Sequence, residues 1–434
     1  MRLRGEYDIL PHPDRSKGKP TLLTSLLNTK RRRDYPLLFL LSGLLVLALN
    51  VLLHRGWLGG LTGMMMWGDF IANFAGGIQY RADVSQLYDP YLQEQSQATL
   101  IAPTISTHFA PFISMPHVAW AFSLISPLPL AWAVGLELVL SLGCLAAAVI
   151  LMQRFLVPGW LRTQGLTATQ LGIILGSSLA FIIGLQAGQT HTLTLLLVTG
   201  IIVACRGKKW ALAGILAGLL IYKPQFALGF LLVWLAWRRW DALLSFGLTA
   251  GLWVGVPLVQ HGLGPFQAYL EFSEMLLMLP YARDNFPVAI LSTPYALLAS
   301  IVPLQAASVL RVLLAAGVVV ASAGLAWFAH RRRNAPAAGR DAAQVLAVFY
   351  PLLVLPHALI YDLLILAPAI LLLAENHPQP GSLLKPTIAI YLGTFLLPLA
   401  GYALHMALTA LIPAGFFASQ LRFFRQALAS IPHR

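Results

Sequence analysis

Several polar side chains occur where the surrounding sequence is almost entirely apolar. Asp69 lies within Met64-Met65-Met66-Trp67-Gly68-Asp69-Phe70, and Lys223 lies within Ile221-Tyr222-Lys223-Pro224-Gln225. A carboxylate held in such surroundings can act as a general base toward a hydroxyl group, and a lysine supplies a point charge that suits a phosphate. Each residue also has a purely structural interpretation. Asp69 can cap a helix that starts at Phe70, and Lys223 can extend its ammonium group to a membrane interface.

Two further polar groups interrupt apolar stretches later in the chain. Gly188-Gln189-Thr190-His191 offers amide and imidazole groups suited to sugar hydroxyls, although it can also be a simple tight turn. Pro356-His357-Ala358-Leu359-Ile360-Tyr361-Asp362 places His357 and Tyr361 four residues apart, on one face if the stretch is helical. Arg311, near one end of an apolar run, can bind a phosphate or reach the interface.

The composition requires that these residues be positioned by a membrane protein. Of 434 residues, 58% are hydrophobic and 10% are charged, and the mean hydropathy is +0.73. A soluble domain carries about 25% charged residues, so too little charge is available to cover a water-facing surface. Cys144 and Cys205 lie inside apolar runs and carry neither a redox nor a zinc signal. We therefore predict an all-α, polytopic integral membrane protein.

The basic residues predict the orientation of the chain. Nine of the 29 Lys and Arg residues fall in residues 1–35, directly before the first apolar stretch. The positive-inside rule places this end in the cytoplasm, and no small-residue cleavage site of a signal peptide follows. The net charge of +13 does not indicate nucleic-acid binding, because no aromatic residues alternate with these charges.

About twelve transmembrane helices (range 10–13) are expected, since each crossing needs roughly 20 apolar residues. The candidate spans are 36–53, 129–153, 167–186, 189–205, 210–223, 224–237, 241–260, 307–330, 343–357, 361–375, 386–404 and 405–421. With these crossings, 24 Lys and Arg residues face the cytoplasm and five face outward: Arg55, Arg81, Lys223, Arg283 and Arg311. The proline-containing pieces 110–127 and 288–304 are read as re-entrant segments that do not cross fully; the alternative is an ordinary extra span with a misplaced boundary elsewhere.

The predicted organisation is a single transmembrane catalytic domain, 36–421, between a basic cytoplasmic tail, 1–35, and a short cytoplasmic tail, 422–434. Two outward loops, about 55–109 and 261–288, hold seven of the sixteen carboxylates. Asp69, Gln189, Lys223, Arg311 and the His357, Tyr361 and Asp362 group all map to the outward face. The sequence contains no metal-ligand spacing, no phosphate-binding loop and no dinucleotide fingerprint, so we expect no cofactor and no metal site, without excluding a divalent metal.

Short motifs in a consistent order resemble glycosyltransferase family 87 of the GT-C superfamily, over about residues 40–400. Asp69-Phe70 with Leu87-Tyr88-Asp89-Pro90 is similar to the opening of the family, and Phe109-Ala110-Pro111-Phe112 with Pro127-Leu128-Pro129 to its proline segment. The core and the late part of the family are resembled by Gly188-Gln189, Ala213-Gly214-Ile215-Leu216-Ala217-Gly218, Tyr222-Lys223-Pro224-Gln225, Pro356 and Tyr361-Asp362-Leu363. The chain departs from the pattern at Ala110, His191 and Leu355.

The resemblance implies an inverting hexosyltransferase, with mannose as the expected sugar, a polyprenyl-phosphate sugar as donor and a lipid or glycan of the cell envelope as acceptor. Catalysis would take place on the outer face of the cell membrane, with Asp69 as the base. Lys223, Arg311 and His357 would bind the donor phosphate, and Gln189, His191, Tyr361 and Asp362 would bind substrate. Three other functions remain open at this point: a lipid or solute transporter of similar helix count, an inactive assembly partner with the same fold, and a different lipid-linked transferase that moves a pentose or a phosphate-containing group.

Overall fold

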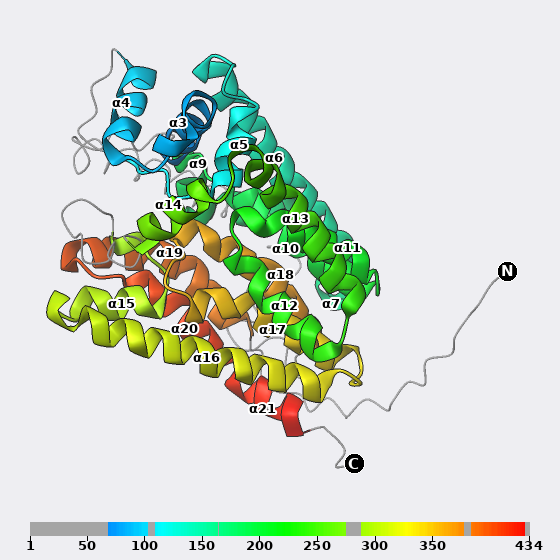
Figure 1. The fold of residues 1–434 in the computed structure, drawn as a ribbon. Helices are drawn as coiled ribbons and strands as arrows, with labels where there is room; N and C mark the ends of the chain where they lie inside the picture. Colours follow the sequence, from blue (N-terminus) through cyan, green and yellow to red (C-terminus); the bar gives the residue numbers. More distant parts are fainter. Residues whose placement is uncertain (1–67, 103–108, 164, 275–287, 377–382, 430–434) are drawn as a thin grey trace, which may run out of the picture.

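The computed structural model describes residues 68–102, 109–163, 165–274, 288–376 and 383–429 (Figure 1). Throughout this part of the chain the secondary structure is helical, and no β-strand occurs in it beyond an isolated antiparallel bridge between Leu291 and Leu359. The all-α prediction is therefore confirmed for the described residues. The first predicted span, 36–53, and the basic tail, 1–35, lie outside them.

The α-helices of the described chain vary widely in length. They are α3 (Gly68–Ala82), α4 (Pro90–Ile101), α5 (Pro116–Ser123), α6 (Leu130–Phe155), α7 (Gly159–Thr163), α8 (Ala168–Gly176), α9 (Leu179–Ala187), α10 (His191–Arg206), α11 (Trp210–Leu219), α12 (Gln225–Trp237), α13 (Trp240–His261), α14 (Gly264–Ser273), α15 (Pro294–Ile301), α16 (Ala307–Arg332), α17 (Ala337–Val354), α18 (Leu366–Asn376), α19 (Leu384–Leu404), α20 (Leu411–Ser419) and α21 (Leu421–Ala429). Short 3-10 helices include η1 (Val84–Gln86), η2 (Leu220–Tyr222), η4 (Val288–Ile290), η5 (Leu304–Ala306), η6 (Ile360–Ile365) and η8 (Leu408–Ala410).

Four of these helices are long and apolar enough to cross a membrane: α6, α13, α16 and α19. A fifth span is possible if α8 and α9, which meet at a bend of 65°, count as one. The described chain thus supports a polytopic arrangement but does not confirm twelve crossings. The predicted spans 189–205, 210–223, 224–237 and 405–421 form apolar helices of only 10–17 residues. The reason is local: glycine, proline and 3-10 turns end these helices early, and the polar motifs occupy the breaks.

The two pieces predicted not to cross fully form only short helices. The piece 110–127 contains α5 and the piece 288–304 contains α15, and each helix has eight residues. At about 1.5 Å per residue, such a helix covers about 12 Å, against roughly 30 Å of hydrocarbon. Neither helix can therefore cross a membrane by itself.

The first expected outward loop is folded where it is described. In α3, Phe70 and Phe74 are buried against Ala133 of α6, and α3 packs extensively on α5 and on α4. Tyr88 joins this layer to α14, since its ring contacts those of Tyr269 and Phe272. In Figure 1, α3, α4 and α14 form the upper left part of the molecule. This packing holds the start of α3, which carries Asp69, close to the end of α9 and the turn that follows it.

The core of the molecule is built around α10, α12 and α17. Its largest fully buried side chains include Phe226, Phe230 and Trp234 on α12. Helix α12 packs on α16 and α17, while α10 packs on α6 and α11. Close approach of α11 to α13 depends on glycine: a Cβ atom on Gly214 would lie 2.1 Å from the carbonyl oxygen of Ala242. Small residues at such crossings let helix backbones approach closely in membrane proteins.

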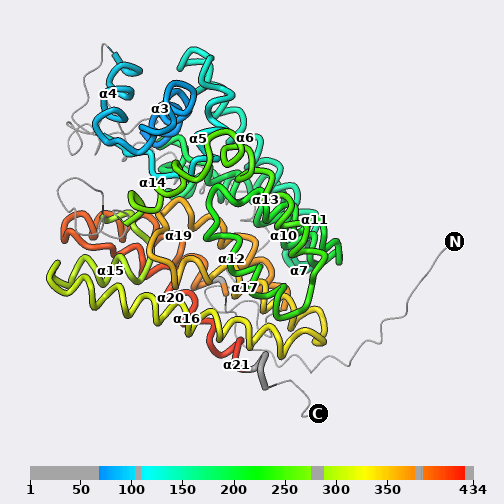
Figure 2. Tube along the Cα trace, in the orientation of Figure 1, coloured from blue at the N-terminus to red at the C-terminus, as the bar shows by residue number. Residues whose placement is uncertain are grey.

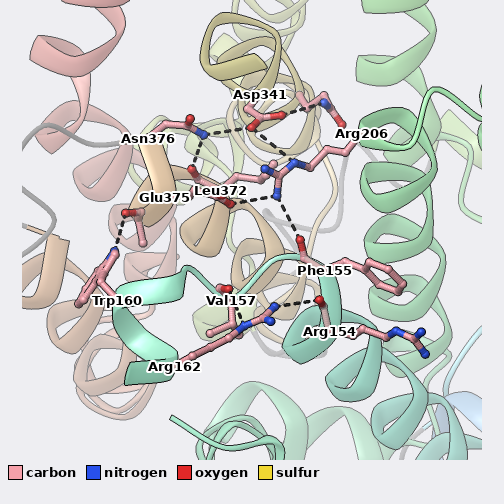
Figure 3. Close-up of polar contacts among 12 residues, drawn as sticks. Arg154, Phe155, Val157, Trp160, Arg162, Arg206, Asp341, Leu372, Glu375 and Asn376 are labelled. Carbon is pink, nitrogen blue, oxygen red and sulfur yellow. Dashed lines mark hydrogen bonds and ion pairs between the residues drawn. The ribbon is translucent and has the colours of Figure 1, made fainter. Parts of the chain in front are cut away.

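One end of this core is closed by a network of ion pairs and hydrogen bonds (Figure 3). Arg206, at the end of α10, places its Nε 3.6 Å from Oδ2 of Asp341 and its Nη1 3.0 Å from Oε2 of Glu375. The same Nη1 donates to the carbonyl of Phe155 at the end of α6, and Asn376 donates to Asp341. We refer to Arg206, Asp341, Glu375 and Asn376 as the basic-end network. It ties together the ends of α6, α10 and α18 and the start of α17.

The polar turns predicted from the sequence lie at the other ends of the same helices. Helix α10 starts at His191 and ends at Arg206, so its 16 residues separate the two regions by about 24 Å. Helix α17 runs the opposite way: Asp341 is near its start, and its end leads to His357. Figure 2 shows α10 and α17 within the bundle, where the two helices contact each other.

Candidate active site

Asp69 lies in the first turn of α3, but its carboxylate does not cap that helix. Oδ2 of Asp69 accepts a hydrogen bond of 2.7 Å from Nε2 of Gln189, 120 residues further along the chain. The backbone carbonyl of Asp69 accepts from the side chain of Asn73, whose Oδ1 accepts from Ser114. The capping alternative therefore does not describe the contacts of this side chain. The carboxylate is directed at another polar group across the fold.

Gln189 is held in place by the tight turn between α9 and α10. Gly188 has a φ of 68°, in the left-handed region that glycine adopts without steric cost. The backbone N–H of Gln189 donates to the carbonyl of Gly184, and its carbonyl accepts from Nδ1 of His191 at 2.8 Å. The His191 ring packs over Gly184, where any Cβ would meet it at 2.6 Å. The turn is thus both a tight turn, as one interpretation held, and the support of a polar side chain.

Lys223 follows the 3-10 helix η2 and points at η6. Its Nζ lies 3.0 Å from Oδ1 of Asp362 and 5.1 Å from the centre of the Tyr361 ring. The other carboxylate oxygen of Asp362 accepts from the backbone N–H of Leu359, which fixes the carboxylate in η6. Lys223 therefore pairs with a buried acid, and its ammonium is not simply extended toward an interface.

The loop that carries His357 is tied to the 288–304 segment. The N–H of Ser292 donates to the carbonyl of Ala358 at 2.8 Å, and the hydroxyl of Thr293 donates to the carbonyl of Pro356 at 3.0 Å. The piece predicted as re-entrant thus runs directly beside the polar motif at 356–362.

The electrostatics of the site follow from burial. Burial raises the pKa of the Asp69 carboxyl above its usual value, while the Gln189 hydrogen bond and the Lys223 charge lower it and the Asp362 charge raises it. Burial also lowers the pKa of the His357 imidazole to about 4, with the Asp362 charge acting against this change and the Lys223 charge adding to it. His357 is therefore neutral near pH 7, and Lys223 carries the positive charge next to Asp362.

Most of the predicted site residues come together, from four separate parts of the chain. Asp69 on α3, Gln189 and His191 at the α9–α10 turn, Lys223 after η2, and Tyr361 with Asp362 in η6 are connected by the contacts above and by a distance of 6.3 Å between the rings of His191 and Tyr361. His357 belongs to the same group through its interaction with Lys223 and Asp362. We call these seven residues the polar cluster.

Arg311 is not part of this cluster in the described contacts. It lies in the first turns of α16, next to Leu310, which packs on Tyr295 and Ala299 of α15. It is therefore close to the 288–304 segment, and none of the described hydrogen bonds or ion pairs joins it to Lys223 or to Asp69.

Some residues around the cluster were not singled out from the sequence. Asn73 and Ser114 connect Asp69 to the 110–127 segment, and Tyr222 directs its hydroxyl at Thr194, which lies one turn into α10. Asn73 stands four residues after Asp69, a spacing that could have indicated contact on one helix face. The described residues include no group of three or more His, Cys, Asp or Glu side chains suited to a metal ion.

Comparison with known protein families decides the class of protein. The profile of glycosyltransferase family 87 matches residues 112–356, more than half of the chain. The chain belongs to glycosyltransferase family 87. It is a glycosyltransferase of a membrane-embedded family, and the resemblance inferred from short motifs is confirmed. The matched region includes Gln189 and Lys223, and it ends before Tyr361. No match was found among curated protein sequences or among solved structures.

Proposed function

We propose that this glycosyltransferase transfers a hexose, with mannose as the first candidate, from a polyprenyl-phosphate sugar to a lipid or glycan acceptor. The observation that carries the proposal is the polar cluster itself. In a membrane glycosyltransferase, it brings a carboxylate, Asp69, to the same site as a lysine, Lys223. The other groups there include the amide of Gln189, the ring of Tyr361 and the carboxylate of Asp362, which pairs with the lysine. A sugar phosphate requires a base for the incoming hydroxyl and a cation for the departing phosphate.

The reaction is a single displacement. Asp69 removes the proton of the acceptor hydroxyl as its oxygen forms a bond to the anomeric carbon. The bond from that carbon to the phosphate oxygen breaks, and the electron pair leaves with the phosphate. Lys223 stabilises the negative charge that develops on this oxygen. Because attack and departure occur on opposite sides of the anomeric carbon, the configuration inverts.

The other site residues are assigned by their positions. One hydrogen of the Lys223 ammonium is donated to Asp362, and the other two, which have no hydrogen-bond acceptor among the described residues, are proposed to bind the phosphate. His357 and Arg311 are proposed to assist in phosphate binding, and Gln189, His191, Tyr361 and Asp362 to line the sugar site. The polyprenyl chain is proposed to run along the 288–304 segment, which is supported by the hydrogen bonds of Ser292 and Thr293 to the His357 loop.

We also propose that the site faces outward across the cell membrane, with both chain termini in the cytoplasm. Support comes from the separation of charge along α10: the basic-end network with Arg206 lies at one end, and the polar cluster at the other. Arg154 and Arg162 are also close to the network end, as Figure 3 shows. The positive-inside rule assigns such an end to the cytoplasm. The proposed arrangement is about twelve crossings in one domain, 36–421.

The test is transfer by purified protein in lipid nanodiscs, with radiolabelled polyprenyl-phosphate mannose and a lipid and glycan extract as acceptor. Wild type is compared with Asp69→Asn, Lys223→Ala and the control Asp241→Asn, an exposed acid at the start of α13. We expect transfer by wild type and the control, and a loss of about 100-fold or more in Asp69→Asn. Equal transfer by Asp69→Asn would remove Asp69 from catalysis. If wild type is inactive with mannose but active with a glucose or arabinose donor, the assigned sugar is wrong and the reaction class stands.

A further inference from the structure

Among the described residues, the two oxygens of the Asp69 carboxylate differ in their hydrogen bonds. Oδ2 accepts from Nε2 of Gln189 at 2.7 Å. No other hydrogen bond from the described part of the chain reaches this carboxylate. The two oxygens are therefore not equivalent among the described contacts: Oδ2 already accepts one hydrogen bond, whereas Oδ1 has no described donor and keeps its full acceptor capacity.

The backbone of the residue that engages Oδ2 is restrained by three features of the turn. Gly188 adopts the left-handed conformation, the Gln189 N–H is bonded to the carbonyl of Gly184 at 2.9 Å, and the Gln189 carbonyl is bonded to His191. A side chain that only contacted a mobile substrate would gain little from such restraint. A side chain that must hold a carboxylate in one orientation needs it, since second-layer contacts of this kind set the geometry of the group they touch.

We infer that Gln189 is the positioning residue of Asp69, whose amide holds Oδ2 and thereby presents Oδ1 to the acceptor hydroxyl. This inference rests on the proposed function and changes one assignment within it: Gln189 acts through Asp69 and not mainly on the sugar. It also makes the turn between α9 and α10 part of the catalytic apparatus, although the family match alone gives the turn no role.

A positioning role has a consequence for protonation. A hydrogen bond to the charged form of a carboxyl favours that form, so the Gln189 amide opposes the effect of burial on the Asp69 pKa. Asp69 lies in α3, outside the helices that qualify as membrane spans. If the amide is removed, the pKa of Asp69 must rise, and the base must be lost at a higher pH than in wild type.

Other groups around Asp69 do not explain such a change. Lys223 and Asp362 act on it from η2 and η6, with opposite signs. Tyr361 is also near, and burial keeps its phenol protonated by raising its pKa. The ionisable groups on the elements packed against α3 are His117 on α5, Glu137 on α6, Asp83 beside η1, and Asp89, Tyr91 and Glu94 at α4. All of these remain unchanged when only Gln189 is replaced.

The experiment measures the protonation of Asp69 without relying on turnover. Dicyclohexylcarbodiimide adds to protonated carboxyl groups in apolar surroundings, and mass spectrometry quantifies the adduct on the Asp69 peptide as a function of pH. Gln189→Met keeps the size of the side chain and removes the donor, whereas Gln189→Glu places a second carboxylate there. We expect the pH of half-maximal labelling to rise by about one unit in Gln189→Met and further in Gln189→Glu. Gln153→Met, which alters a glutamine bonded to Leu166 near the basic end, is the matched control and should not shift it.

Transfer assays with the same variants separate the two roles of Gln189. We expect the acid limb of kcat/KM to move up in pH by the same amount, with the donor KM changed by less than about twofold. An unchanged labelling midpoint with a raised donor KM would overturn the inference in favour of direct sugar binding. The labelling readout does not depend on the sugar, so failure to transfer any tested sugar contradicts the proposed function alone, and an unshifted midpoint contradicts the positioning role alone.

Discussion

The ammonium Nζ of Lys223 lies 3.0 Å from Oδ1 of Asp362, which is 139 residues further along the chain. The Lys223 side chain is 17% exposed and that of Asp362 is 3% exposed, so the pair is largely removed from water. In a buried pair, loss of one partner leaves an uncompensated charge, while replacement of both can be tolerated. A comparison of single and double variants of this pair therefore distinguishes its contribution to stability from the role of Lys223 in the reaction.

Lys223→Met is therefore expected to affect both folding and transfer. The variant leaves Asp362 buried and unpaired, which lowers the free energy of unfolding by about 3–5 kcal/mol. Transfer should fall by about 100-fold, because the charge on the leaving phosphate is no longer stabilised. The double variant Lys223→Met with Asp362→Asn should recover the stability but not the transfer, measured by thermal unfolding and by product formation in nanodiscs. Recovery of transfer in the double variant would show that Lys223 has only a structural role.

The pH dependence of transfer should report Asp69. A base must be deprotonated, and burial raises the pKa of this carboxyl. The value of kcat/KM should therefore be constant above this raised pKa and decrease tenfold per pH unit below it. The pKa read from the acid limb should therefore be higher than about 3.9, the pKa of an exposed aspartate. A pH profile of wild type from pH 4 to pH 8 checks this prediction.

His357 should not account for that limb. Burial lowers the pKa of its imidazole to about 4, so His357 is neutral above about pH 5 and cannot produce a limb that lies higher. His357→Asn is expected to change the size of kcat/KM but not the pH at which it falls. If the limb instead moves or disappears in His357→Asn, the group that titrates is the histidine.

The residues of the site could be predicted from the sequence where a polar side chain interrupts an apolar stretch. Asp69, Gln189, Lys223 and Asp362 stood out for this reason, and their contacts join them in one cluster. Their pairing was not predictable, because Asp69 and Gln189 are 120 residues apart and nothing in the local sequence specifies a long-range partner. Arg311 satisfied the same criterion as Lys223, and it lies on α16, where the described contacts neither join it to the cluster nor test its assignment.

The fold was predictable in class and less so in its crossings. Long apolar runs such as that of α6 became single helices, since their length exceeds what a bilayer needs. Runs interrupted by glycine or proline became bent or short helices, as with α8 and α9. The basic-end network was missed entirely. Asp341 directly follows Arg340, and Glu375 ends an apolar stretch, so both appear ordinary until α10, α17 and α18 are brought together.

The turn at Gly188 offers a test of how finely the site is positioned. Its φ of 68° makes Gly188→Ala strained, at a cost of about 1–2 kcal/mol in the free energy of unfolding. Because the same residue directs Gln189 toward Asp69, transfer should fall by more than tenfold in protein that remains folded. Gly188→Asn should lie closer to wild type, since asparagine tolerates this conformation better. Gly143→Ala, within α6 where a Cβ meets nothing within 4 Å, is the control.

The basic-end network should matter for folding and not for chemistry. Arg206→Met leaves Asp341, whose side chain is 4% exposed, without its cation. We expect the free energy of unfolding to fall by about 3 kcal/mol, near the lower limit for a broken buried pair because Arg206 itself is 24% exposed. Arg154→Met, an exposed arginine near the same end, should change stability by less than about 1 kcal/mol. Since about 24 Å of α10 separates Arg206 from Gln189, folded Arg206→Met protein should keep the wild-type donor KM and the wild-type acid limb. If fully folded Arg206→Met protein shows a changed donor KM or a shifted acid limb, the two ends of α10 are coupled. The network would then help to position the base.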